Sequence, residues 1–127
     1  MAIMQYEDGV LHFLVERFKY NVDYGYHAYI FTRNEIEFSY FFDKIMSLLK
    51  DFPVFIRSNK DTITIQSADR QVMLICEKET YYRLGLRSNI VIASADYPED
   101  DFNDIFCPLC NMPLYDGVFR YDKEDLI

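Results

Sequence analysis

The sequence is poor in glycine, proline and cysteine, and it lacks tryptophan. Only 4 of its 127 residues are Gly and 4 are Pro, which excludes collagen-like and proline-rich disordered chains. The 3 cysteines are an odd number, so the sequence does not indicate a disulfide framework. No apolar run reaches the roughly 18 residues that would span a membrane. A basic region followed by an apolar run, as in a secretory signal, is missing too, and we expect a cytoplasmic protein that contacts no membrane.

Positive charge is scarce as well. Lys and Arg together number 13 against 21 Asp and Glu, which gives a formal net charge of -8. An acidic surface repels phosphate backbones, so we expect no direct binding to nucleic acid. Such a surface suits a basic partner protein, and it also suits solubility alone.

The sequence is instead rich in the hydrophobic and aromatic residues that form a packed core. Half of its residues are hydrophobic, and Tyr and Phe number 11 each. This composition indicates a folded protein rather than a disordered segment. The length predicts one globular domain over residues 1–127, with a tail that frays over about 122–127.

Hydrophobic periodicity predicts alternating helices and strands. One-face spacing of apolar residues predicts helices over 7–20 and 34–52, the second capped by Asn34 and ended by Pro53. Alternating or continuous apolar runs predict strands over 27–32, 54–57, 62–66, 71–77 and 89–95. A short acidic helix follows Pro98, and 115–121 can add an edge strand. This order predicts an α/β (or α+β) domain, a mixed sheet of about five strands with helices packed on its faces.

Cys107 and Cys110 have the spacing of a zinc knuckle. Two thiolates two residues apart can take one edge of a tetrahedral zinc site, but two further ligands are needed. Cys76 and a histidine could supply them, or the thiolates of a second copy across a two-fold homodimer. The alternative is that all three cysteines are reduced, partly buried and without metal. Zinc is the one cofactor that the sequence leaves open.

A cluster of acids follows the apolar run at 89–95. The cluster consists of Asp96, Glu99, Asp100 and Asp101, and the last three load the first turn of the predicted short helix, as the helix dipole favours. Magnesium or calcium binding is the alternative, although the spacing and glycine of an EF-hand loop are missing. The cluster is our first candidate for partner binding.

Tyr24 and Tyr26 belong to a tyrosine-rich stretch and are the second candidate. Tyrosines are enriched at the energetic centres of protein interfaces, while core packing is an equally ordinary use for them. For catalysis the sequence marks nothing: His12 and His27 have no Ser or Cys that a motif assigns as a partner. We therefore assign no catalytic residue and expect a protein that is not an enzyme.

Several segments, taken in order, resemble the motor lobe of phage large terminases and related helicase-type NTPases. The strand at 27–32 and its long helix resemble the strand and helix that follow the phosphate loop. The hairpin at 62–75 resembles the one that leads into the second acid motif. Arg83-Leu84-Gly85-Leu86-Arg87, and then the run from Asn89 to Asp96, resemble the segment that reads Arg-Gly, an apolar strand and Asp-Glu. The resemblance covers about residues 10–105.

Two parts of that pattern are missing. No Gly-rich phosphate loop with its lysine precedes these segments, and Asp96 is followed by Tyr97 instead of a glutamate. Without a lysine and a backbone nest, the phosphates of a nucleotide have no cradle. The resemblance therefore implies a relic or mimic of a motor lobe, not an active ATPase.

The sequence thus favours a small, acidic, non-catalytic factor that binds another protein, one that itself handles nucleic acid. A regulator or inhibitor encoded by a phage or mobile element fits this description. The two alternatives are a zinc-stabilised domain that uses Cys107 and Cys110, and a degenerate motor-like lobe associated with DNA packaging.

Overall fold

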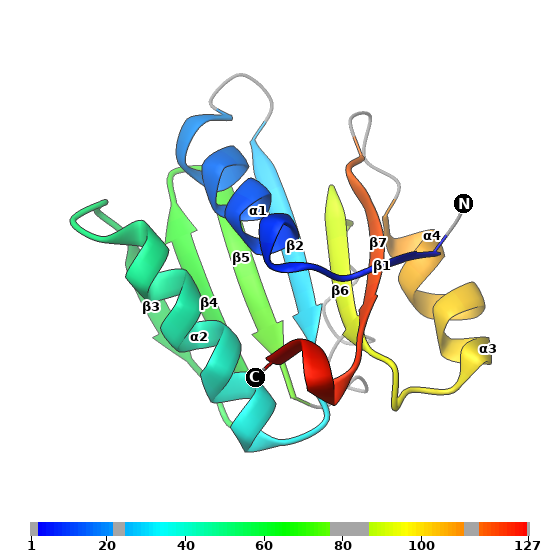
Figure 1. Cartoon of the computed structure of the whole chain (residues 1–127). Coiled ribbons are helices and arrows are strands. Elements are labelled where there is room, and N and C mark those ends of the chain that lie inside the picture. The colour runs from blue at the N-terminus through cyan, green and yellow to red at the C-terminus, as the bar shows by residue number, and fades with distance from the viewer. Residues whose placement is uncertain (1–2, 22–24, 77–86, 111–114, 127) are drawn as a thin grey trace.

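The computed structural model describes residues 3–21, 25–76, 87–110 and 115–126. These residues form one seven-stranded sheet with the order β1-β7-β6-β2-β5-β4-β3 (Figure 1). Five neighbouring strands are parallel: β1 (Ile3–Gln5), β7 (Gly117–Tyr121), β6 (Ile90–Ser94), β2 (Tyr26–Phe31) and β5 (Arg70–Ile75). The strands β4 (Thr62–Ser67) and β3 (Phe55–Ser58) continue the sheet in antiparallel fashion. The α/β class and the mixed sheet are confirmed, with seven strands where about five were expected.

The additional strand that the sequence did not reveal is β1. It has 3 residues, too few to show an alternating pattern, and it pairs with β7 so that Ile3 lies opposite Val118. Strand β7 was expected at an edge and instead lies between β1 and β6.

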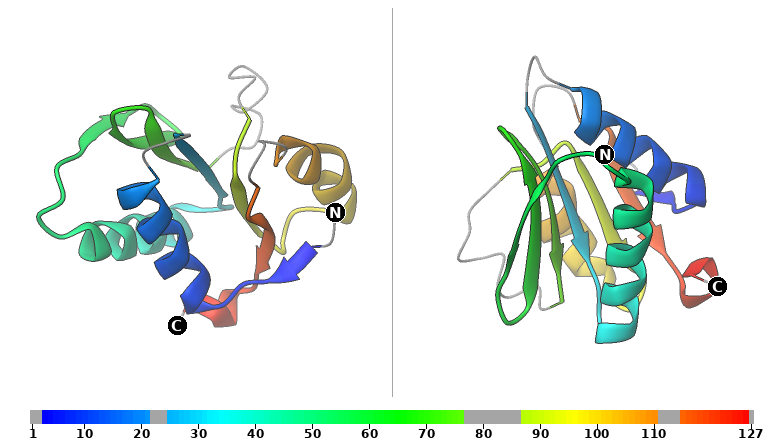
Figure 2. Two further views of the ribbon diagram at one scale, coloured as in Figure 1. Left: turned by 90° about the horizontal axis from the view of Figure 1, so that it is seen from above. Right: turned by 90° about the vertical axis from the view of Figure 1, so that its left-hand side faces the viewer.

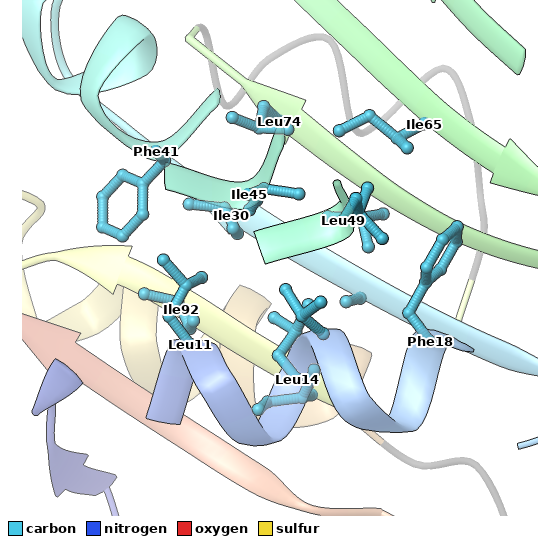
Figure 3. Packing of buried hydrophobic residues seen from close by; sticks show 14 of the residues in the cluster. Leu11, Leu14, Phe18, Ile30, Phe41, Ile45, Leu49, Ile65, Leu74 and Ile92 are labelled. Atoms are coloured by element: carbon cyan, nitrogen blue, oxygen red, sulfur yellow. The ribbon is translucent and has the colours of Figure 1, made fainter. Parts of the chain in front are cut away.

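Two helices cover one face of the sheet, α1 (Asp8–Tyr20) and α2 (Glu35–Leu49) (Figure 2). The predicted cap of α2 is confirmed, since the side chain of Asn34 accepts a hydrogen bond from the Glu37 N–H at 2.9 Å. Each helix buries its apolar stripe against alternate residues of the strands, and each fully buried aliphatic or Phe side chain contributes about 1.5–3 kcal/mol. Figure 3 shows the centre of this core: Leu11, Leu14, Phe18, Ile30, Phe41, Ile45, Leu49, Ile65, Leu74 and Ile92.

The other face of β6 and β7 packs against one continuous helical segment. It consists of α3 (Glu99–Asp101), the π-helical turn η2 (Phe102–Phe106) and α4 (Cys107–Leu109). In the π-helical turn the Cys107 N–H bonds to the carbonyl of Phe102. Phe102, Ile105 and Phe106, the three residues that the sequence assigned to the apolar side of this helix, are all buried in this second core.

Within the tail at 122–127, residues 123–126 form the 3-10 helix η3 (Lys123–Leu126). Leu126 packs against the first core. A carboxylate oxygen of Asp125 accepts hydrogen bonds from the Gln5 side chain at 2.9 Å and from the Asp122 N–H at 2.8 Å. These contacts connect the tail, which the sequence assigned to a frayed end, with β1 and the core.

None of the helices in the described ranges has the length and apolar character needed to cross a membrane.

Candidate interaction surface at the carboxyl edge of the sheet

The parallel strands β1, β7, β6 and β2 all end at one edge of the sheet, which we call the carboxyl edge. In Figure 1 it is the lower edge, where α2 begins and where η3 lies. In open α/β sheets, ligands bind outside the carboxyl ends of the strands, because the connecting segments there leave side chains and backbone groups facing outward. This edge is the candidate site.

Three aromatic side chains fill the space behind the carboxyl edge. Tyr6 directly follows β1 and is 1% exposed, while Phe41 of α2 and Tyr121 of β7 are fully buried. Their ring centroids lie 5.8 Å (Tyr6 to Phe41), 6.3 Å (Tyr6 to Tyr121) and 5.0 Å (Phe41 to Tyr121) apart. All three pairs meet edge to face, the arrangement that the ring quadrupoles favour. We call this trio the aromatic cluster.

The aromatic cluster lies where the chain passes from its first strand to its first helix. A phosphate loop needs a strand, a Gly-rich loop and then a helix. Here only Tyr6 and Glu7 separate β1 from α1. The Tyr6 N–H is already bonded to the carbonyl of Arg120 at 2.9 Å. This junction is therefore too short to hold a Gly-rich phosphate loop.

Glu37 is a buried carboxylate beside the aromatic cluster and is 5% exposed. Its Oε1 accepts a hydrogen bond from the Tyr121 hydroxyl at 2.7 Å and another from the Arg33 N–H at 3.2 Å. Burial raises the pKa of Tyr121, and the Glu37 carboxylate raises it further, so the hydroxyl remains a donor. The arrangement holds Glu37 in place as an acceptor and uses it to join α2 to β7.

A pocket of about 430 Å³ opens next to this carboxylate. Its most exposed apolar side chain is Ile36, at 84% exposure. The pocket is lined by Asn34, Ile36, Glu37, Tyr40, Lys123 and Leu126. Its walls are mainly apolar and carry one cation, which suits the side chain of a docking protein better than a phosphate group.

Acidic side chains follow three neighbouring strands at the carboxyl edge. Because the strands are parallel, the acids after β1, β6 and β7 are brought to the same edge from distant parts of the sequence. Most are exposed; Asp101 and Asp125 are half-buried. We call this set the acidic rim: Glu7, Asp8, Asp96, Glu99, Asp100, Asp101, Asp122, Glu124 and Asp125.

The predicted acids at 96–101 form the part of the acidic rim that follows β6. Asp96 is exposed, and its N–H is bonded to the Ser94 hydroxyl at 3.1 Å. Glu99 forms an ion pair with Arg120 at 3.0 Å, and the Arg120 guanidinium also lies 4.7 Å from the ring centroid of Phe102. Surface ion pairs of this kind contribute little to stability, so Glu99 stays available to a partner.

The second predicted group is not on the surface. Tyr26 is fully buried, and its hydroxyl donates a hydrogen bond to Asp116 at 2.8 Å. Arg17 Nε lies 3.7 Å from the same carboxylate. Burial raises the pKa of Asp116, while the Tyr26 hydrogen bond and Arg17 lower it. The assignment of Tyr26 to the binding surface is therefore wrong, and Tyr24 lies outside the described residues.

The structure does not gather the three cysteines. Cys110 is 1% exposed, and its thiol donates to the carbonyls of Asn89 at 3.2 Å and Gly117 at 3.5 Å. Burial raises its pKa to about 11, so the thiol form dominates at neutral pH. Across residues 3–21, 25–76, 87–110 and 115–126, no three His, Cys, Asp or Glu side chains are placed to hold a metal ion. A metal set of Cys76, Cys107 and Cys110 is not formed.

Sequence reasoning missed the parts of the edge that come from the chain ends. Asp122 and Glu124 were assigned to a frayed tail, and Tyr6 preceded every predicted element. A signal for Tyr6 was present, since a large aromatic directly before a helix start often packs back onto the core.

Comparisons with known proteins concern the fold. No family model matches the sequence, and no curated protein is similar to it. A search of solved structures finds the large terminase of a thermophilic bacteriophage, with a TM-score of 0.50 and 11% sequence identity. The fold resembles that of a phage large terminase. The match covers 80% of this chain and 27% of the terminase chain, so this chain spans about a quarter of that protein.

The likeness to the terminase confirms the resemblance drawn from the sequence, at the level of fold. At 11% identity it assigns no residue a role. The strand at 27–32 and its long helix correspond to β2 and α2. The hairpin at 62–75 corresponds to β4 and β5, and the apolar run corresponds to β6. Most of the segment at 83–87 lies outside the described residues.

Proposed function

We propose that this chain is a non-catalytic binding factor with a terminase-like fold, whose acidic rim docks onto a basic surface of a partner protein. One observation carries the proposal. Acids from three neighbouring strands face outward at the edge where such folds bind ligands, while the aromatic cluster fills the space behind them. The edge is thus a charged surface with one apolar pocket beside Glu37.

The charge of the rim is suited to steering. The chain carries a net charge of -8, and charge of one sign gathered on one edge raises the association rate with a basic partner at low salt. The apolar pocket beside Glu37 adds a place where one partner side chain can be desolvated, and such buried anchors carry most of the energy of an interface.

The partner chemistry follows from the same charge. Proteins that handle nucleic acid expose Lys and Arg to phosphates. An acidic rim on a phage-encoded or mobile-element protein can occupy such a surface and thereby regulate or inhibit it. In this proposal the chain acts in the cytoplasm and does not itself bind nucleic acid.

The test is a comparison of two charge-reversed variants as baits in the native host. Asp96→Lys/Asp100→Lys changes two exposed acids of the rim and leaves the Glu99–Arg120 ion pair intact. Glu16→Lys/Asp43→Lys makes the same change of charge on the exposed faces of α1 and α2. We expect the rim variant to lose the captured partner, and the helix variant and the wild type to retain it.

The salt dependence separates docking from general charge. For the purified partner, the affinity of the wild type should fall with salt more steeply than that of the rim variant. Equal capture of the partner by all three baits, or an equal loss of captured partner in both variants, would refute the role of the rim.

The fold likeness to a terminase favours a second candidate, a degenerate motor-like lobe that still holds a nucleotide. Titration calorimetry with ATP and ADP in the presence of Mg²⁺ decides between them. We expect no heat of binding, because only two residues join β1 to α1 and they cannot form a phosphate loop. Saturable binding would favour the second candidate over the first.

A further inference from the structure

The strand β3 forms the edge of the sheet opposite to β1, and it is open to solvent. All four of its residues are exposed, with Phe55 at 81% and Ile56 at 44%. An exposed edge strand presents unpaired N–H and C=O groups and is a template for another strand. Shallow hollows of about 380 Å³ flank it, and both are lined by Phe55, Gln66 and Ala68.

The charge around β3 differs from that of the rest of the chain. Residues 52–60 contain Arg57 and Lys60 and no acid, whereas the whole chain has a net charge of -8. The segment therefore lacks the carboxylates that would repel a second copy. The order of the residues in β3 is a stronger argument for a second copy than the charge is. Two antiparallel copies of β3 complement each other in one particular register.

The register follows from symmetry. When two identical strands pair antiparallel about a two-fold axis normal to the sheet, residues equally distant from the axis lie opposite each other and on the same face. With the axis at Ile56, Phe55 lies opposite the partner's Arg57, and Arg57 lies opposite the partner's Phe55. Each copy then supplies one guanidinium to one exposed ring, a favourable cation–π contact.

The neighbouring registers are poorer. An axis at Arg57 would place the two guanidinium groups directly opposite each other, where like charges destabilise. An axis at Phe55 would place Arg57 opposite the partner's Pro53, which has no N–H to donate. Only the register at Ile56 joins apolar to apolar at the centre and cation to ring on both sides.

The distribution of the β3 residues over the two faces of the sheet also favours this register. Ile56 lies opposite Ile65 of β4, which is buried in the core under α2. The two central isoleucines would therefore extend that core across the dimer. Phe55 and Arg57 lie opposite Gln66 and Thr64, on the face away from α2.

We propose that two copies of this chain pair through β3, antiparallel and with Ile56 at the two-fold axis, to form a symmetric dimer with one continuous sheet. The acidic rim lies at the carboxyl ends of β1, β6 and β7 and not along β3, so it stays free. The dimer therefore presents two rims. The dimer stands independently of the proposed function, because neither surface uses residues of the other.

Sedimentation equilibrium over a range of protein concentrations tests the dimer. Phe55→Lys places a cation opposite the partner's Arg57 twice in each dimer, and we expect it to weaken dimerisation about tenfold or more. Tyr20→Lys is the matched control, because it changes an aromatic that is 65% exposed on α1 by the same charge. Phe55→Lys/Arg57→Glu should restore the dimer through two Lys–Glu pairs and make it sensitive to salt. Circular dichroism checks that each variant is folded.

Cysteine crosslinking tests the register, in a background with Cys76→Ser and Cys107→Ser. Directly opposite residues of antiparallel strands have Cα atoms about 4.5–5.5 Å apart, within reach of a disulfide. Ile56→Cys should therefore give a covalent dimer on mild oxidation. The two copies of Ser58 lie four positions apart along the strands, about 13 Å, so Ser58→Cys should not.

Three results would overturn the proposal. The first is a wild type that stays monomeric at every concentration. The second is a dimer that Phe55→Lys leaves unchanged. The third is crosslinking of Ser58→Cys in preference to Ile56→Cys, which would show a different register.

Discussion

The Tyr121 hydroxyl donates a hydrogen bond to Glu37 Oε1 over 2.7 Å, and this contact joins the end of β7 to the first turn of α2. The two residues are far apart in the sequence, and both are buried. A buried carboxylate is costly unless donors satisfy it. The bond therefore supplies a donor to the buried Glu37 carboxylate and joins α2 to β7 at the carboxyl edge.

Removing this donor should destabilise the protein. We expect Tyr121→Phe to lower the free energy of unfolding by about 1–3 kcal/mol, because Glu37 stays buried with one donor fewer. Urea unfolding measures the change, and Tyr20→Phe on the exposed end of α1 is the control. The loss should shrink when Glu37→Gln is present as well, since a neutral acceptor costs less to leave unsatisfied. A Tyr121→Phe protein as stable as the wild type would contradict this account.

Two glycines should respond to alanine in opposite ways. Gly117 has φ +125°, where side chains are strained, and a Cβ there would collide with the Met4 side chain. We expect Gly117→Ala to cost about 1–3 kcal/mol and Met4→Ala not to restore it fully, because the backbone strain remains. Gly9 lies in α1 with no atom within 4 Å of an added Cβ, so Gly9→Ala should stabilise by up to about 1 kcal/mol. Thermal and urea unfolding of both variants checks the contrast.

His27 should make the protein less stable in acid. Burial lowers the pKa of His27 below its ordinary 6.5, while a hydrogen bond to the Asp69 backbone and the charge of Asp69 oppose the shift. A base with a lowered folded pKa contributes stability that is present above the unfolded pKa and is lost as the pH falls below it. The wild type should therefore lose stability between about pH 7 and pH 5 faster than His27→Gln does. The melting temperatures of the two proteins over this pH range check the prediction, and equal losses in both would contradict it.

Cys110 should be inert to alkylation and should limit stability at alkaline pH. Burial raises its pKa from 9.0 to about 11, so its thiol adds stability below about pH 9 that is lost as the pH rises towards 11. Between these values the wild type should lose more stability than Cys110→Ser, which does not titrate there. Mass spectrometry after iodoacetamide treatment at about pH 8 should find Cys107 modified well before Cys110. Equal labelling of the two thiols in the folded protein would contradict this.

The sequence predicted best the elements whose signals are local. The start of α2 followed from the capping residue Asn34, and its buried face from a long apolar stripe, whereas the helix ends at Leu49 and not at residue 52 as predicted. The strand β6 followed from an unbroken apolar run, which fits its burial on both faces. In each case the short-range pattern and the tertiary packing agree, so nothing distant was needed to find the element.

The rest depended on contacts between distant residues. The strand β1 is recognisable only through β7, and η3 is held by Gln5 and by the core. Tyr26 belongs to a tyrosine-rich stretch that suggested a surface, yet Asp116, 90 positions away, supplies its hydroxyl with a buried acceptor. The acids at 96–101 were predicted from the sequence. The other acids of the rim come from the two ends of the chain, and no local pattern could predict that they lie at the same edge.

The pairing of β1 with β7 also bears on how the protein is made. Ile3 needs Val118 as its neighbour, so the nascent chain cannot complete its sheet until the residues up to Tyr121 have left the ribosome. A product that stops before residue 117 would leave both β1 and one side of β6 without a neighbouring strand. Interrupted translation of this chain should therefore yield fragments that aggregate or are degraded, instead of a smaller folded protein.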